Sequence, residues 1–389
     1  MAATRSAASI NATASRLRAA ACLALLLFCF QAPAIDEILL RSGPVRGPGW
    51  SIAEIEARVR LHGDGGPAAV IEVSGIKLPA PFKSIDRVTS SCLRLEFKND
   101  GLVCVGGELR VRAAEGAPLF SPARIEGTFG DKKFRFRLIG LELGGGGIEA
   151  AFDGTQAGFS LTVSGRSLPL SELSRLLDLD RLAAGLAAQA GLVSGELSWR
   201  SSSAQGALNA SLELSKLSFS DGSGLNAGEN LEADLSLNAS RRGGPWRFAS
   251  KASLAAGQIY LHPVFIDAAE GAIRFDSSGM VSRDSKRLSV NDFSYRHQGI
   301  VEVAGSAELG FDGPKLRVDR LLLDTKQTAL SRLHEVYIKP WLLQTVFSKL
   351  EVKGDAIAHL DWSRQGASEA RVTFRQTDLE DQAERFALQ

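Results

Sequence analysis

The chain has few of the side chains from which most catalytic and metal-binding sites are built. Its 389 residues include only 5 histidines, 4 cysteines and 2 methionines. The histidines form no His-Glu-x-x-His motif and show no metal-ligand spacing, and no Gly-x-Ser-x-Gly nucleophile motif occurs. The glycine run 144–147 lacks the lysine of a phosphate-binding loop. We therefore expect a protein that is not an enzyme and that uses no metal or other cofactor.

An excess of charge of one sign is also missing. The chain has 45 basic and 44 acidic residues, which gives a formal net charge of +1. A protein that binds nucleic acid needs a basic surface to neutralise phosphates. The charge balance therefore excludes nucleic acid as an expected partner.

Long apolar runs are absent as well, because no stretch reaches the roughly 20 residues of a membrane-spanning helix. The apolar stretch 19–30 has only about a dozen residues, follows Arg16 and Arg18, and precedes Ala32-Pro33-Ala34. This order is typical of an export signal with its cleavage site. We interpret residues 1–34 as a signal peptide or, alternatively, as an uncleaved N-terminal anchor in the inner membrane. The rest of the chain is then expected in the periplasm.

Two cysteines remain after residue 34. Cys92 and Cys104 flank Asn99-Asp100-Gly101, and an Asp-Gly pair between two alternating segments predicts a hairpin turn. Cysteines on adjacent strands in an oxidising compartment favour a disulfide. Two buried free thiols are the alternative.

What the chain does have is alternation of apolar and polar residues, starting at residue 55 and recurring almost to the end. Such a period of two places the apolar side chains on one face of a strand and the polar ones on the other. We predict a mainly β protein: a long, curled antiparallel sheet with one apolar face. In segment 208–219 the apolar residues change parity, which predicts a bulge at Ser215 or Lys216, and repeated bulges would curl the sheet. The residues predicted to line the apolar face are Ile55, Val59, Phe134, Phe136, Leu161, Val163, Leu212, Leu214, Leu231, Leu235, Leu237, Val301, Val303, Leu309, Val372 and Phe374.

Two stretches predict helical insertions between the strands. The first covers 169–190, and the second runs from about 328 to 350 and contains Pro340, which must kink or split it. Each is followed by a strand with leucine, a polar residue and tryptophan, at 197–199 and at 360–362. A helix followed by such a strand, used twice, predicts a fold built by repetition.

The repeat also suggests how the chain is divided. Because the second unit stops inside a strand pattern, we expect this sequence to be the front part of a longer repetitive β protein. The predicted regions are the N-terminal signal or anchor (1–34), a β-sheet region with the cysteine hairpin (35–167), the first helix-plus-strands unit (168–327) and the second unit (328–389).

Two short helices cannot cover so many one-sided strands, so the apolar face needs another partner. One possibility is a second sheet, packed about 10 Å away around a dry core, which would make a structural or protein-binding solenoid. The other is a curled sheet whose apolar concave face stays open as a groove. An exposed apolar surface of that size marks a binding site, and in an exported protein the fitting cargo is the acyl chains of lipids. The residue pattern leaves both open.

Four features of the chain occur together in one known family. They are the segment 49–52 (Gly-Trp-Ser-Ile) with the strand 55–61, the Cys92–Cys104 hairpin, the strand-helix-Leu-Ser-Trp unit, and the closing segments 377–381 and 385–388. In these features the chain resembles AsmA-like envelope proteins of the YdbH branch, a group that has also carried the label of a dicarboxylate transport domain.

The resemblance implies a long, twisted, taco-shaped β-groove that bridges the inner and outer membranes and along which phospholipids slide. Its expected partners are phospholipids and components of either membrane. Members of the family are usually much longer than this chain, and the family offers no catalytic motif. The dicarboxylate label would call for arginines that face inward, whereas the arginines here mostly alternate outward. We therefore expect phospholipid transport between the two membranes.

Overall fold

The structure, a computed structural model, describes most of the chain after the N-terminal segment. It covers residues 35–388 except 48–49, 62–65, 79–82, 99–100, 114–121, 131, 178–185, 203, 263, 285, 313–314, 343–344, 346, 367 and 382–386. The predicted signal or anchor at 1–34 therefore lies outside the described residues. Within them, no helix has the length and hydropathy needed to cross a bilayer.

Most of the described residues, 77%, belong to strands. The first half of the chain contains β1 (Glu37–Ser42), β2 (Val45–Gly47), β3 (Trp50–Ile52), β4 (Glu54–Arg60), β5 (Ala68–Ile76), β6 (Ile85–Lys98), β7 (Gly101–Ala113), β8 (Ala123–Phe129), β9 (Lys133–Leu143), β10 (Gly146–Thr155), β11 (Gly158–Pro169) and β12 (Leu186–Ser202). The second half contains β13 (Gln205–Asp221), β14 (Asn226–Arg242), β15 (Trp246–Leu261), β16 (Val264–Asp267), β17 (Ile273–Val281), β18 (Arg287–His297), β19 (Val301–Asp312), β20 (Lys315–Thr325), β21 (Thr328–Ala329), β22 (Leu350–Ser363), β23 (Glu369–Asp381) and β24 (Ala387–Leu388).

These strands form one antiparallel meander. β1 pairs with β4, and from β4 onward each strand pairs with its neighbours in the chain. The long strand β15 pairs with both β16 and β17, and β22 pairs with both β20 and β21. β2 and β3 form a small separate pair. The sheet does not close into a barrel, so the predicted fold class is confirmed.

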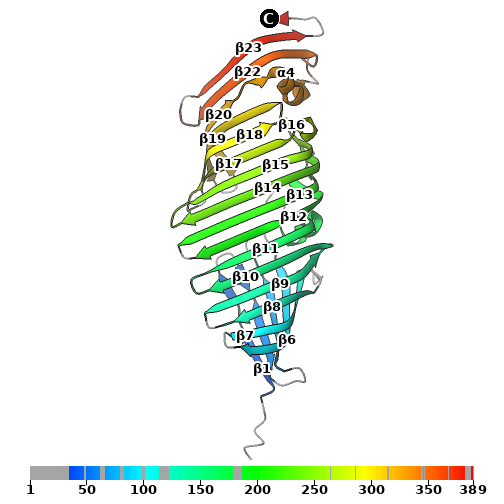
Figure 1. Cartoon of the computed structure of the whole chain (residues 1–389), viewed down its shortest axis with the longest axis vertical. Coiled ribbons are helices and arrows are strands. Elements are labelled where there is room, and N and C mark those ends of the chain that lie inside the picture. The colour runs from blue at the N-terminus through cyan, green and yellow to red at the C-terminus, as the bar shows by residue number, and fades with distance from the viewer. Residues whose placement is uncertain are drawn as a thin grey trace, which may run out of the picture.

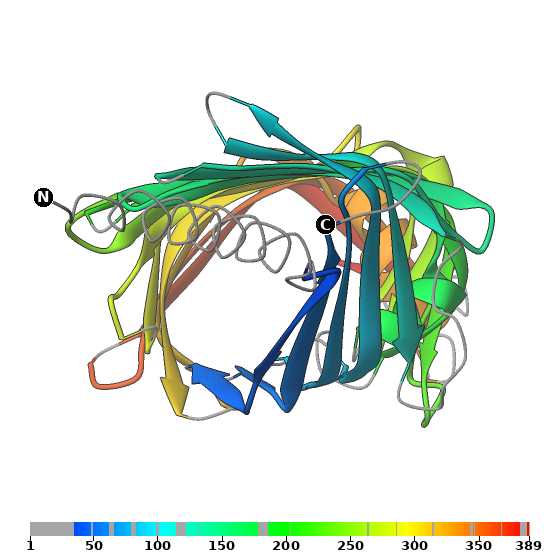
Figure 2. The same ribbon diagram turned by 90° about the horizontal axis from the view of Figure 1, so that it is seen from below.

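The sheet extends along the whole molecule. From β7 to β23 the strands lie across the long axis and follow one another along it, whereas the N-terminal strands, coloured blue, run more steeply behind them at the lower end (Figure 1). Seen along that axis the sheet follows an arc, and the helical pieces lie on one side of it (Figure 2). Pairing continues without interruption past residues 167 and 327, where the sequence suggested unit boundaries.

Bulges occur where the sequence changes parity. Between β13 and β14 the register shifts after Leu214, so that Leu217 is paired with Leu231, and Lys216 has a φ of +52°. The predicted bulge at 215–216 is therefore confirmed. Because two residues of one strand face one residue of the other at a bulge, the apolar side chains return to the same face.

Within the first predicted helical insertion the structure describes one short helix and the start of a strand, and residues 178–185 lie outside the described residues. α2 (Leu170–Leu176) has seven residues, and by Leu186 the chain is already in β12. The helix predicted for 169–190 is thus wrong in its C-terminal part. There Leu186 is paired with Asp221 and Ala188 with Phe219 of β13. Hydrogen bonding to this long neighbouring strand overrides the weak helix preference of the alanine-rich segment.

The second insertion is divided into three pieces. They are α4 (Leu330–Leu333), a π-helical turn (His334–Ile338) and α5 (Lys339–Leu342). Pro340 is the second residue of α5, directly after the π-helical turn, so the helix is split near the proline as predicted. The described residues between α5 and β22 are Thr345, which lies in a bend, and 347–349, which form turns, so the helix predicted to reach about residue 350 is not helical there.

Cys92 in β6 and Cys104 in β7 form a disulfide, with 5.6 Å between their Cα atoms. The two cysteines are 12 residues apart. A loop of that size gives at most about 3 kcal/mol of stabilisation in the chain-entropy treatment. The bond therefore holds the local strand register of this hairpin.

The buried core is small for a chain of this length. Fifteen hydrophobic residues are buried among those described. The largest cluster contains Leu231, Leu254 and Ile273 from three strands together with Ala268 of a 3-10 turn, η1 (Ala268–Glu270). No second sheet covers the large sheet within the described ranges. The sandwich or solenoid with a dry core therefore lacks its second layer here.

Candidate functional site: the apolar face

The register of the strands places all sixteen predicted lining residues on one face of the sheet. Leu161 is paired with Phe152 and Trp199, and Leu212 with Leu235. Residues paired across antiparallel strands point to the same side of a sheet, and side chains alternate between sides along each strand. Following these pairs from β4 to β23 joins Ile55 at one end to Phe374 at the other. We call this side of the sheet the apolar face.

Much of the apolar face is open to solvent. Five of the sixteen residues count as exposed, with exposed fractions of 39% for Phe134, 36% for Leu212, 37% for Leu235, 51% for Val372 and 60% for Phe374. Ten others are partly exposed: Ile55, Val59, Phe136, Leu161, Val163, Leu214, Leu237, Val301, Val303 and Leu309. Large apolar side chains at this degree of exposure, contiguous across a sheet, are typical of a binding surface.

Leu231 is the exception among the predicted lining residues. It is 3% exposed, because it belongs to the buried cluster together with Leu254 and Ile273. η1, β16 and neighbouring side chains pack over this cluster on the side of the helical pieces, and we call them the cover. Leu231 therefore holds the cover in place and does not line the open surface.

The apolar face carries a row of four aromatic rings, of which the predicted set contained only Phe134. The rings of Phe134 and Phe152 are stacked at 5.3 Å, those of Phe152 and Phe159 at 5.7 Å, and Trp199 meets Phe159 edge-on at 5.0 Å. Trp199 lies between Ser198 and Arg200, and Phe152 is followed by Asp153. Extending the period-two pattern into β10 and β12 would have found them.

The opposite face of the sheet is polar and carries ion pairs between strands. Glu56 accepts hydrogen bonds from Arg41 and Arg58, and these neighbours, Arg58 first, lower its pKa. Glu302 is paired with Lys326 and Arg296 in the same way. Exposed pairs of this kind each contribute little stability. They make this side of the sheet polar and solvated, whereas the other side is apolar.

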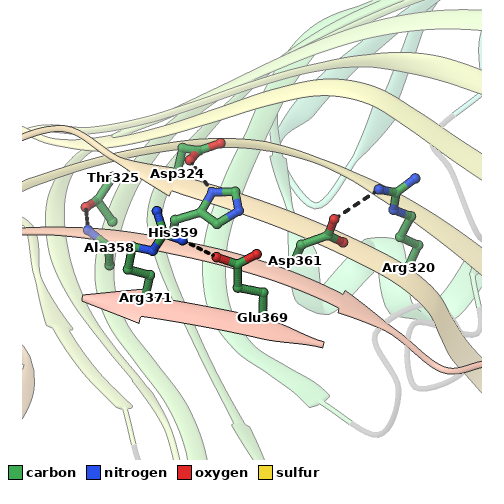
Figure 3. A network of polar contacts seen from close by, with 8 residues as sticks. All are labelled: Arg320, Asp324, Thr325, Ala358, His359, Asp361, Glu369 and Arg371. Carbon is green, nitrogen blue, oxygen red and sulfur yellow. Dashed lines mark hydrogen bonds and ion pairs between the residues drawn. The ribbon is translucent and has the colours of Figure 1, made fainter. Parts of the chain in front are cut away.

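The polar face continues to the last strands. His359 Nδ1 lies 2.7 Å from Asp324, Arg320 is paired with Asp361 at 3.1 Å, and Arg371 with Glu369 at 2.8 Å (Figure 3). The hydrogen bond with Asp324 raises the pKa of His359.

A buried polar cluster holds the second helical insertion against the apolar face. His297 is 1% exposed, and its Nδ1 lies 2.8 Å from the hydroxyl of Tyr337 in the π-helical turn. That hydroxyl lies 2.5 Å from the hydroxyl of Tyr295. His334, the first residue of the π-helical turn, is also buried, so this side of the turn packs inward.

Burial lowers the pKa of both His297 and His334, because it disfavours the charged imidazole. A histidine with a lowered folded-state pKa contributes stability above the unfolded-state pKa of about 6.5. That contribution is lost as the pH falls below this value. We expect the free energy of unfolding to decrease from pH 7.5 to pH 5.5, by up to about 1.4 kcal/mol per pH unit for each histidine. Denaturant unfolding at the two pH values measures it.

The variant His297→Gln should make this pH dependence shallower. His359→Gln is the matched control, because the raised pKa of His359 gives a contribution of opposite sign. If His297→Gln and the wild type lose equal stability on acidification, the assignment to this cluster is wrong.

The described residues offer little else that could support chemistry. They contain no group of three or more His, Cys, Asp or Glu side chains that could hold a metal ion. The expectation of a protein without enzyme activity stays a prediction.

Comparison of the chain with models of protein families, with curated proteins and with solved structures found no match. The resemblance to AsmA-like proteins therefore remains a prediction from the sequence. The functional argument depends on the apolar face itself.

Proposed function

We propose that the chain binds the acyl chains of phospholipids on its apolar face and serves as a module for phospholipid transport between the inner and outer membranes of a cell envelope. The observation that carries the proposal is an apolar face that is continuous across the sheet from β4 to β23 and open to solvent over much of its area.

The dimensions of this face suit an acyl chain. In β13 the apolar residues run from Leu208 to Leu214, a distance of about 20 Å at roughly 3.3 Å per residue. One half of the hydrocarbon core of a bilayer is about 15 Å thick. An acyl chain can therefore lie along a strand with its whole length against apolar side chains.

The energetics suit a passive conduit. Each methylene removed from water contributes about 0.8 kcal/mol, so an acyl chain prefers the apolar face to water by many kcal/mol. Its environment on the apolar face resembles that in a bilayer, so transfer from a membrane changes the free energy little. Lipid then moves in either direction according to supply.

Lipid extraction from the purified protein tests the proposal. We expect mass spectrometry of an organic extract to find phospholipid in near-stoichiometric amounts. We also expect the protein to speed the transfer of fluorescent phospholipid between two vesicle populations. A β-rich, folded protein that carries no lipid and does not speed transfer would contradict the proposal.

A further inference from the structure

One long edge of the sheet carries an excess of arginine. At this edge lie the turns that join β12 to β13, β14 to β15 and β17 to β18, opposite the edge with the helical pieces. The arginines near these turns that have no ion pair among the described residues are Arg200, Arg241, Arg242, Arg247, Arg283 and Arg287. We call this side the arginine edge. Asp284 lies among them, but it accepts hydrogen bonds from Ser282 and from the Lys286 amide.

The opposite edge carries carboxylates at the corresponding turns. Asp221 accepts a hydrogen bond from Asn226, which lowers the pKa of Asp221 to about 2. Asp267 caps η1, and Glu270 is paired with Arg332. Arginines without an ion pair among the described residues therefore lie at one edge, whereas these carboxylates lie at the other.

Arg241 differs from the other arginines because it lies on the apolar face. It is paired with Gly206 and shares its side of β14 with Ala239 and Leu237. Its guanidinium lies 5.3 Å from the centre of the Trp246 ring, a cation–π contact. Both side chains pack over Gly206, where an added Cβ would come within 2.7 Å of the Trp246 ring.

This arrangement leaves hydrogen-bond donors of the Arg241 guanidinium unused at the border of the apolar face. The Arg241 Nε is buried and has no hydrogen-bond partner among the described residues. Arg241, Trp246 and Arg283, together with Gly243 and Gly244, line a pocket of about 390 Å³. A guanidinium pair is suited to a phosphate, which it can bind through two parallel N–H donors.

We propose that the pocket of Arg241, Trp246 and Arg283 binds the phosphate of a glycerophospholipid whose acyl chains lie on the apolar face. From Arg241 the apolar row of β14 runs inward through Ala239, Leu237 and Leu235. A lipid with its phosphate at the arginine edge therefore directs its acyl chains along the strand. The inference depends on the proposed function and adds a preference for lipids that carry a phosphate.

The test compares two labelled lipids that differ in the headgroup. The full-length protein is incubated with vesicles that contain acyl-labelled phosphatidylglycerol or acyl-labelled diacylglycerol, which has no phosphate, and the captured lipid is measured. We expect Arg241→Gln with Arg283→Gln to lower capture of phosphatidylglycerol relative to diacylglycerol about tenfold. Arg241→Lys should restore part of the preference, because it keeps the charge. Arg247→Gln is the matched control, since Arg247 is exposed on the polar face of the neighbouring strand.

Several outcomes would overturn the inference. An unchanged lipid preference in the double variant would show that the pocket does not bind the phosphate. An equal loss of phosphatidylglycerol capture in Arg247→Gln would show that the preference comes from the general positive charge of the arginine edge and not from the pocket. Binding of inorganic phosphate as tight as that of the lipid would make this a site for free anions. Failure of the wild type to capture either lipid would contradict the proposed function as well.

Discussion

Leu235→Asp is expected to abolish most lipid capture while the sheet stays folded. Leu235 lies midway along β14 on the apolar face, between Leu212 of β13 and Ala252 of β15. Because it is 37% exposed, a carboxylate at this position stays hydrated in the free protein. An acyl chain that covers it must remove that hydration without supplying a hydrogen bond, which costs several kcal/mol. We expect bound phospholipid, measured by mass spectrometry, to fall at least tenfold.

Ser236→Asp is the matched control for this experiment. It introduces the same charge one residue further along the strand and therefore on the polar face, where Ser236 is paired with Lys251. We expect it to leave lipid capture unchanged. Circular dichroism of both variants should show the same β content. Equal lipid capture by the two variants would mean that the apolar face is not the binding surface.

A photo-crosslinking residue at the same two positions provides a second measurement. At 235 it should form an adduct with phospholipid, whereas at 236 it should not. The comparison does not depend on the stability of either variant, because it is made on protein that remains folded.

The fold and the two faces of the sheet could be predicted because the alternation of apolar and polar residues is a local property of the sequence. Alternation with a period of two determines which side chains share a face without knowledge of the neighbouring strands. The pattern was informative even at the bulge, since the change of parity between Leu214 and Leu217 is visible in the sequence. A long meander also adds strands in chain order, so its topology requires no distant pairing.

Features that depend on tertiary packing could not be predicted in this way. The segment that begins at Leu186 has a helical composition, and it is a strand because β13 is long enough to pair with it. The alternation correctly put Leu231 on the apolar face, but its burial depends on η1, more than 30 residues later in the chain. His334 is buried and Tyr337 is partly buried in the π-helical turn, where Tyr337 contacts His297 of β18, far away in the sequence.

The pocket of Arg241, Trp246 and Arg283 could not be predicted from the sequence either, for the same reason. Arg241 follows a run of alternating residues and looks in the sequence like an ordinary charged turn. Its role depends on three strands, because the ring of Trp246 and the bare backbone of Gly206 position the guanidinium on the apolar face. Only the register reveals that the neighbouring Arg242 points to the other side.

Leu231→Ala is expected to cause the largest loss of stability among single truncations of the sixteen predicted lining residues. Leu231 is almost completely buried among Leu254, Ala268 and Ile273, so removing its side chain leaves a cavity beneath the cover. Substitutions of this kind cost about 2 to 4 kcal/mol. Denaturant titration followed by tryptophan fluorescence measures the change.

The matched control is Leu237→Ala, in the same strand and on the same face. Leu237 is only partly buried in the absence of lipid, so we expect its truncation to cost about 1 kcal/mol or less. The two truncations should then respond differently to lipid. Bound phospholipid should increase the cost of Leu237→Ala, because the acyl chain completes the packing around it, and should leave the cost of Leu231→Ala unchanged. If lipid had the same effect on both costs, the division of the apolar face into a covered part and an open part would be wrong.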